Sequence, residues 1–240
     1  MNKKEEINEA VWKAINKTIN KFRENPYYFF TESDIHSYFY YALYSSEHEA
    51  LTKDGKPMYC IHREYPTNFR YNKEELLDNT ILEACELEGI LGSRGHYDIA
   101  VLDPDFINKV NSEKDIINKN VSLVIKRAKN NKNFANDKEL LFAIEFKYVI
   151  SNSRNFVNEI IMDNKKLLFA IESGGAAKAV NLVFCNVDST KYTGRIITEV
   201  QNANQEILSI FIHSYYNKGE KIPPPKLIMN KKEPRIKYGK

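Results

Sequence analysis

The sequence is poor in the residues and patterns that define several large classes of protein. Its 240 residues include only three cysteines, Cys60, Cys85 and Cys185, and no Cys-x-x-Cys pair. Distant cysteines in odd number argue against a disulfide framework and a thiolate zinc site. No apolar run reaches the roughly eighteen residues of a membrane helix. Residues 1–6 lead into an amphipathic pattern and not into the apolar core of a secretion signal. We therefore expect a cytoplasmic protein that contacts no membrane.

The sequence also lacks an excess of basic residues before residue 218. The net charge is +3, but residues 218–240 hold eight Lys and Arg against two acids, and the remainder has 27 basic and 30 acidic residues. The body of the chain is therefore not a general binder of polyanions. The tail is either a solvated terminus or an arm that contacts phosphates. Gly174-Gly175 lacks the surroundings of a phosphate-binding loop and is expected to end a helix.

The spacing of apolar residues predicts strands and helices that alternate along the chain. Helices are expected at 4–23, 32–45, 73–87, 155–171 and 193–215, and strands at 58–65, 97–102, 140–150 and 179–187. This order favours an α/β layered domain with a mixed sheet. We expect one domain over residues 1–217, with an Asn- and Lys-rich insertion at about 104–138 that holds one helix near 116–128. A basic tail with no regular structure follows at 218–240.

Two opposite charges interrupt the most apolar predicted strand, residues 140–150. Glu145 and Lys147 share one face of that strand with Leu141 and Ala143, because side chains alternate between the two faces. A charge in such a place is costly unless it is paired, hydrogen-bonded or bound to a metal. The stretch Glu145-Phe146-Lys147 is the only Glu-x-Lys in the sequence. One interpretation is an ordinary ion pair that faces solvent on an edge strand.

A third charge gives the pair a chemical interpretation. Asp98 lies in the predicted strand 97–102, and adjacent strands would bring it to Glu145 and Lys147. Two converging carboxylates repel each other unless a cation lies between them, and their hard oxygen atoms favour Mg²⁺ or Mn²⁺. Such an ion polarises a phosphoryl oxygen and acidifies a bound water, while a neighbouring Lys holds that water or helps to deprotonate it. These are the requirements of phosphodiester hydrolysis.

With these motifs the chain resembles the PD-(D/E)xK nuclease superfamily over residues 32–187. Arg94-Gly95-His96-Tyr97-Asp98-Ile99-Ala100-Val101 matches the second strand of that family, without its Pro, and Ala143-Ile144-Glu145-Phe146-Lys147 matches the third. The resemblance implies a restriction-endonuclease-like core: a central mixed four-stranded sheet flanked by helices, here with extra N- and C-terminal helices. It also implies a Mg²⁺- or Mn²⁺-dependent nuclease, with Asp98 and Glu145 as metal ligands and Lys147 positioning the attacking water.

Other residues are expected to assist this site. Glu32, in the helix before the first strand, is the preferred auxiliary acid, and Glu64 on the first strand is its rival. Arg94 and His96 share the face of Asp98 and are candidates for phosphate contacts. His36 is expected to be packed or exposed and not a general base, and the aromatic residues of 27–30 and 38–44 are expected to pack in the core.

The substrate and partners stay open at this point. The partner is expected to be nucleic acid, with DNA preferred over RNA, and cutting both strands of a duplex would favour a homodimer. Endonuclease and exonuclease action are not distinguished. The alternative is a member of the same fold that has no activity and binds nucleic acid or a protein. A further alternative is an unrelated α/β protein.

Overall fold

A computed structural model describes nine segments of the chain. They are residues 2–44, 48–71, 93–110, 138–151, 154–172, 174–186, 190–203, 207–213 and 226–228. The helices expected at 73–87 and near 116–128, and most of the tail at 218–240, lie outside these segments. Contacts divide the chain into two compact units. Unit 1 comprises Met1–Asn8, Tyr44–Ala143 and Phe169–Ala179, and unit 2 comprises Glu9–Leu43, Ile144–Leu168 and Val180–Lys240. The single domain expected over 1–217 stays a prediction.

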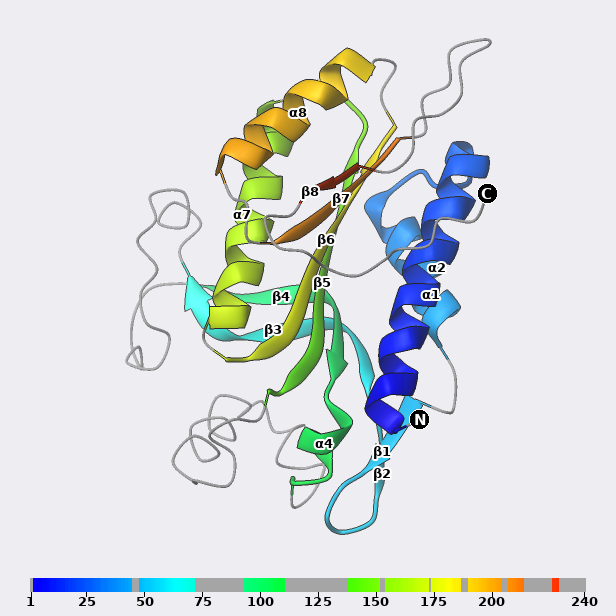
Figure 1. Cartoon of the computed structure of the whole chain (residues 1–240), viewed down its shortest axis with the longest axis vertical. Helices are drawn as coiled ribbons and strands as arrows, with labels where there is room; N and C mark the ends of the chain where they lie inside the picture. Colours follow the sequence, from blue (N-terminus) through cyan, green and yellow to red (C-terminus); the bar gives the residue numbers. More distant parts are fainter. Residues whose placement is uncertain are drawn as a thin grey trace. The chain divides into compact units, whose positions relative to one another are not determined.

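The main sheet has six strands in the order β3-β4-β5-β6-β7-β8 (Figure 1). They are β3 (Ile61–Tyr71), β4 (Ser93–Leu102), β5 (Leu140–Val149), β6 (Ala176–Cys185), β7 (Leu208–His213) and the three-residue β8 (Lys226–Ile228). The sheet is mixed, since β3 and β4 are antiparallel, β6 and β7 are parallel, and β7 and β8 are antiparallel. The α/β class and the mixed sheet are therefore confirmed. The expected four strands are wrong, because β7 is a fifth long strand and β8 extends the edge.

Unit 1 is built on the antiparallel pair β3 and β4. It also contains a separate two-stranded antiparallel sheet of β1 (Glu49–Leu51) and β2 (Pro57–Tyr59), which precede β3 in the chain. Strand β3 continues to Tyr71, past Pro66, where the prediction ended it. Because β3 is an edge strand, the missing N–H of proline can face away from the ladder, and the register shifts between Pro66 and Arg70. Asp103 caps the short helix α4 (Pro104–Ile107) by accepting a hydrogen bond from Asp105 N at 2.9 Å.

In unit 2 the helices cover both faces of the strands (Figure 1). On one face are α1 (Lys3–Glu24) and α2 (Glu32–Leu43), and on the other α7 (Arg154–Glu172) and α8 (Thr190–Ala203). The rings of Phe22 in α1 and Phe184 in β6 meet edge to face at 5.0 Å, and those of Phe39 in α2 and Phe146 in β5 at 5.2 Å. The opposite face packs Val149, Val157, Ile160, Val183, Ile196 and Phe211 into a buried cluster. Strand β5 is therefore covered on both faces, as its apolar sequence predicted.

The start of α2 is fixed by a capping box, which the sequence pattern Thr31-x-x-Asp34 before a helical stretch predicts. Asp34 N donates to Thr31 Oγ1 at 3.2 Å, and Thr31 N donates to Asp34 Oδ2 at 2.9 Å. These reciprocal hydrogen bonds satisfy amides that have no partner within the helix. They also set the position of Glu32, the first residue of α2.

The predicted helix at 193–215 is wrong in its second half. The structure has α8 at Thr190–Ala203, followed by strand β7, whose residues are all buried. The run Leu208-Ser209-Ile210-Phe211-Ile212 contains apolar residues at both helical and strand spacings, so periodicity alone does not separate the two. Pairing with β6 decides for a strand, with Val180 opposite Leu208 and Cys185 opposite His213. Strand β8 likewise places three residues of the expected irregular tail against β7.

Candidate metal and catalytic site

Glu145 and Lys147 lie on β5, an inner strand of the sheet and not an edge. Glu145 is 2% exposed and the Lys147 side chain 14%. The interpretation of a solvent-facing ion pair on an edge strand is therefore wrong. Both side chains point to the α7 side of β5, as their ion pairs with α7 residues show. Of the two charges in this apolar strand, Glu145 is thus buried and Lys147 is mostly shielded from solvent.

Glu145 is paired with a lysine of α7. Lys166 Nζ lies 2.7 Å from Glu145 Oε2, and both side chains are almost completely buried, at 8% and 3% exposed. Lys166 Nζ also lies 3.7 Å from Asp163 Oδ1, one helical turn earlier. The positive charge of the Lys166 ammonium group compensates the negative charge of the buried Glu145 carboxylate. Removal of either partner would leave the other charge isolated in a medium of low dielectric constant.

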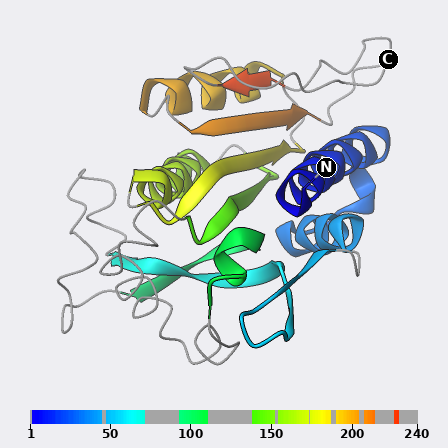
Figure 2. The ribbon, with the colours of Figure 1, turned by 60° about the horizontal axis from the view of Figure 1, so that its bottom comes forward.

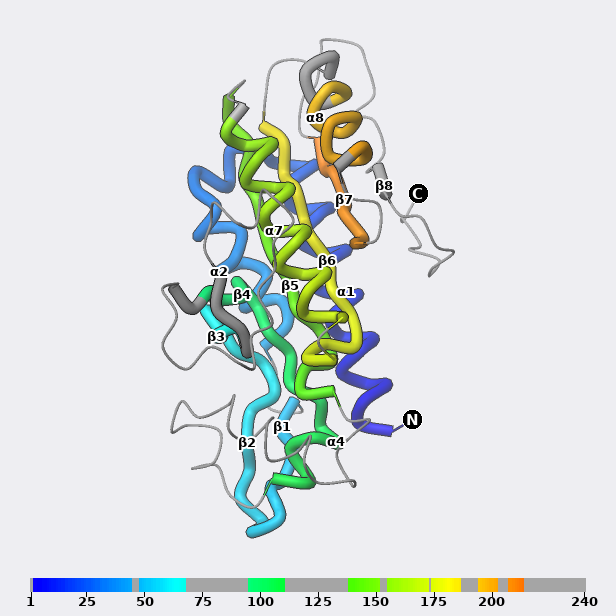
Figure 3. Tube along the Cα trace, turned by 90° about the vertical axis from the view of Figure 1, so that its left-hand side faces the viewer, coloured from blue at the N-terminus to red at the C-terminus, as the bar shows by residue number. Residues whose placement is uncertain are grey.

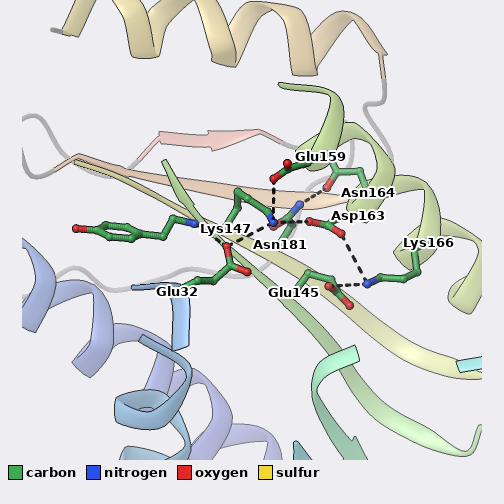
Figure 4. Close-up of polar contacts among 9 residues, drawn as sticks. Glu32, Glu145, Lys147, Glu159, Asp163, Asn164, Lys166 and Asn181 are labelled. Atoms are coloured by element: carbon green, nitrogen blue, oxygen red, sulfur yellow. Dashed lines mark hydrogen bonds and ion pairs between the residues drawn. The ribbon is translucent and has the colours of Figure 1, made fainter. Parts of the chain in front are cut away.

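Three carboxylates surround Lys147 (Figure 4). Its Nζ lies 3.4 Å from Glu32 Oε2, 3.4 Å from Glu159 Oε2 and 3.9 Å from Asp163 Oδ2. Asp163 therefore faces both lysines. With Glu145, the cluster holds four carboxylates against two ammonium groups, so its formal charge is −2. That excess and the hard oxygen donors fit one divalent cation such as Mg²⁺ or Mn²⁺.

The surroundings of Lys147 keep it protonated. Burial by itself lowers the pKa of Lys147, but Asp163, Glu32 and Glu159 more than offset burial and raise that pKa well above its ordinary value. A lysine of this kind does not accept a proton from water near neutral pH. Of the two roles expected for Lys147, holding the attacking water fits this environment and deprotonating the water does not.

The raised pKa of Lys147 predicts how stability depends on pH. A group whose pKa is higher in the folded state stabilises fully below its unfolded value of about 10.5, and that contribution is lost as the pH rises through the folded value. We expect the wild-type free energy of unfolding to fall between pH 10 and 12 more steeply than that of Lys147→Met. Urea titrations at each pH measure the two slopes, with Lys165→Met on α7 as the control. Equal slopes for all three proteins would contradict the assignment.

Glu32 lies close to Lys147, as expected of an auxiliary acid. Besides the ion pair with Lys147, its Oε2 accepts a hydrogen bond from Tyr148 N at 3.0 Å. His36, one turn later on α2, is 6% exposed, and its ring lies 4.8 Å from that of Phe146. The packed histidine of the prediction is confirmed. A carboxylate oxygen of Glu32 and a ring nitrogen of His36 also lie within 4.8 Å of each other, so this pair offers two ligand atoms.

The remaining predicted site residues belong to unit 1. Asp98 lies half-buried on β4, between the registered pairs Arg63–Ile99 and Tyr65–Tyr97, so Glu64 is the residue opposite it on β3. Glu64 has a φ of 50°, a left-handed conformation that is uncommon for glutamate and is enriched at functional sites. His96 is exposed on the same strand as Asp98. Arg94 lies on β4 opposite Arg70, and its side chain is outside the described part. The joint action of Asp98 and Glu145 stays a prediction.

A buried polar layer extends from Glu145 across unit 2. Leu140 N donates to Gly175 O at 2.9 Å and Asn186 N donates to Val149 O at 2.8 Å, and these two hydrogen bonds fit parallel strands β5 and β6 in which Val149 lies opposite Cys185 and Glu145 opposite Asn181. Asn181 pairs in register with Ser209 of β7. Asn164 Oδ1 on α7 accepts hydrogen bonds from Asn181 Nδ2 at 2.8 Å and from Ser209 Oγ at 3.1 Å. The interior under α7 is therefore polar at the level of Glu145 and apolar further along, where Val149 lies.

The charged residues of α7 that lie in this cluster were not expected from the motifs, although their spacing in the sequence is regular. Glu159, Asp163 and Lys166 have the spacing i, i+4 and i+7, which places all three on one face of a helix. That face turns toward β5, since all three side chains form ion pairs with Lys147 or Glu145, although the Glu159 side chain is still 49% exposed. A charged stripe next to an apolar stripe is usually read as a solvated face, so the pattern alone does not reveal this contact.

Comparisons with known proteins give no relative: no protein-family model, curated protein or solved structure matches the chain. Among the described residues, no helix is both long enough and apolar enough to cross a membrane.

Proposed function

We propose that the protein is a nuclease that requires Mg²⁺ or Mn²⁺ and hydrolyses phosphodiester bonds, with DNA as the preferred substrate. The observation that carries this proposal is the charged cluster of unit 2. Four carboxylates and two lysines from β5, α7 and α2 lie together, and their formal charges sum to −2. Glu145 and Lys166 are buried, whereas the Glu32 and Glu159 side chains are 34% and 49% exposed and can be reached from solvent. A cluster whose only purpose was structural would be more stable with balanced charges or with apolar residues of similar volume.

The order of elements supports a restriction-endonuclease-like assignment. Helix α2 is followed by the short strands β1 and β2, then by β3 and β4, the four-residue helix α4, β5, α7 and β6. Without the short elements β1, β2 and α4, the order is a helix, three strands, a helix and a strand. The PD-(D/E)xK superfamily, which the motifs resemble, has a helix, three strands, a helix and a fourth strand. Asp98 lies on the second of these strands and Glu145 and Lys147 on the third. Membership of that superfamily is part of the proposal.

The proposed mechanism gives each residue one task. Asp98 and Glu145 would hold the cation, and Glu32 would be the auxiliary acid, with Glu64 as its rival. A bound Mg²⁺ would supply charge to a phosphoryl oxygen and acidify a water molecule. Lys147, held as an ammonium group, donates hydrogen bonds to the attacking water and to the phosphate oxygen on which negative charge develops. The water oxygen forms the new P–O bond, the opposite P–O bond breaks, and the leaving oxygen takes up a proton to give an alcohol and a phosphate monoester.

A cleavage assay on four substrates tests the proposal. Plasmid, linear duplex, single-stranded DNA and RNA are incubated with the protein and Mg²⁺, Mn²⁺ or EDTA. We expect cleavage with either metal and none in EDTA. Asp98→Asn should lower the rate at least about a hundredfold, the usual effect of removing one charge-stabilising group from an active site. Asp105→Asn is the matched control, because Asp105 follows the same strand and its side chain is 63% exposed.

The results separate the proposal from its rivals. Cleavage that survives Asp98→Asn would contradict the assigned ligand. Absence of cleavage on every substrate and with both metals would reject the enzyme and favour a fold that only binds nucleic acid or a protein partner.

A further inference from the structure

Aromatic side chains in unit 2 are exposed in an unusual concentration. The core packing expected for residues 27–30 and 38–44 holds for Phe29 and Phe39, which are 2% and 0% exposed. It is wrong for their neighbours: Tyr27 is 77% exposed, Phe30 80%, Tyr28 54% and Tyr41 73%. Large apolar rings scattered singly on a surface need no explanation, but four within fifteen residues form a patch that calls for a partner.

Two of these rings, Tyr28 and Tyr41, lie beside a groove on α1. The groove has a volume of about 450 Å³ and is lined by Lys13, Lys17, Lys21, Asn16, Asn20 and Tyr38, with Glu24 as the one carboxylate. The three lysines recur every four residues, so they form a row along one side of the helix with about 6 Å between successive positions. Helices α1 and α2 lie side by side in Figure 2.

Lysine and aromatic side chains are directly paired on this face. Lys21 Nζ lies 4.5 Å from the centre of the Tyr28 ring, and Lys17 Nζ lies 5.8 Å from that of Tyr41. The Tyr28 ring also meets Phe29 edge to face at 5.4 Å and Tyr38 at 6.2 Å. The ring is therefore held in place although more than half of it is exposed. Each pair presents a π-face and a positive charge a few ångströms apart.

This combination matches one kind of partner. Single-stranded nucleic acid offers unpaired bases that stack on aromatic rings and phosphates that attract ammonium groups, whereas the bases of a duplex are already stacked. A protein interface would favour the rings but not the row of lysines, since lysine is depleted at protein interfaces. The ion pair of Lys13 with Glu9 is 3.8 Å long and exposed, and such a pair is weak enough to yield to a phosphate.

We propose that the α1–α2 face, formed by Lys13, Lys17, Lys21, Tyr28 and Tyr41, binds single-stranded nucleic acid. Bases stack on Tyr28 and Tyr41, and the lysine row follows the phosphates. This binding needs no metal and does not involve the cluster at β5 and α7. It therefore goes beyond hydrolysis and stands independently of it.

Fluorescence anisotropy with a labelled oligo(dT) strand tests the proposal on the full chain, in EDTA and low salt. We expect the single strand to bind more tightly than a duplex of equal length. Tyr28→Ala and Tyr41→Ala should each raise Kd about fivefold or more, while Tyr28→Phe, which keeps the ring, should bind as the wild type does. Lys21→Ala should reduce the slope of log K against log salt by about 0.7. Lys53→Ala, an exposed lysine of unit 1, should leave Kd within twofold.

Three results would overturn this inference: no binding of the single strand, unchanged Kd in both tyrosine variants, or a dimer of the chain that Tyr28→Ala dissolves. A cleavage assay on the wild-type protein keeps the two proposals apart. If the wild type cleaves DNA but binds no single strand in EDTA, the α1–α2 face alone is rejected, and if it binds the single strand but cleaves no substrate, the nuclease alone is rejected.

Discussion

Lys166→Ala is expected to lower the free energy of unfolding by about 3–5 kcal/mol, because it leaves the Glu145 carboxylate buried without its ammonium partner. Figure 3 shows α7, which carries Lys166, lying along β5 and β6. Urea unfolding in EDTA measures the loss. Lys165→Ala is the matched control on the same helix, since Lys165 precedes Lys166 by one residue and lies on a different face.

The same variant tests whether the cluster holds a cation. In the wild-type protein, Lys166 forms an ion pair with Glu145 and would compete with a metal for that carboxylate. Removing it should raise the affinity for Mg²⁺, and a ligand that binds only the folded state stabilises it by an amount that grows with affinity. We expect Mg²⁺ to raise the melting temperature of Lys166→Ala more than that of the wild type or of Lys165→Ala. An equal or smaller shift in Lys166→Ala would contradict a metal at Glu145.

Lys147→Met is expected to lower the rate of DNA cleavage by about a hundredfold to a thousandfold at saturating Mg²⁺, since it removes the one positive side chain assigned to the developing charge. Lys147→Arg keeps the charge and should recover part of the rate. Single-turnover cleavage measures the chemical step, and a melting curve for each variant sets a temperature at which all are folded. A wild-type cleavage rate in Lys147→Met would contradict the role of Lys147 in the mechanism but would not bear on whether a metal binds at Glu145.

Much of this picture could be predicted from local sequence. Charges in an apolar strand identified Glu145 and Lys147, and the structure places both on an inner strand, with Glu145 buried and the Lys147 side chain 14% exposed. The pattern Thr31-x-x-Asp34 predicted the start of α2, because a capping box depends only on neighbouring residues. Alternation and helical spacing also gave the order of β4, β5, α7 and β6.

What could not be predicted depends on contacts between distant residues. Lys166 follows Glu145 by 21 residues, and only the packing of α7 on β5 brings the two together. Strand β7 was predicted as a helix because its apolar residues fit both the helical and the strand periodicity. Only the hydrogen-bonded pairing with β6, which is distant in the sequence, selects the strand. The local sequence also does not determine which residues of an aromatic run are exposed. Tyr28 and Phe29 are adjacent, yet the Tyr28 residue is 54% exposed and Phe29 only 2%.

The most direct test of the proposed metal site is Mn²⁺ binding, followed by the loss of the free-ion electron paramagnetic resonance signal. The wild-type protein should bind Mn²⁺ through Glu145. Glu145→Gln, which keeps the shape of the side chain and removes its charge, should weaken that binding at least about tenfold, or 1.4 kcal/mol. Glu172→Gln, an exposed acid at the end of α7, should bind as the wild type does. Equal affinity in Glu145→Gln and the wild type, or no binding in either, would contradict the account.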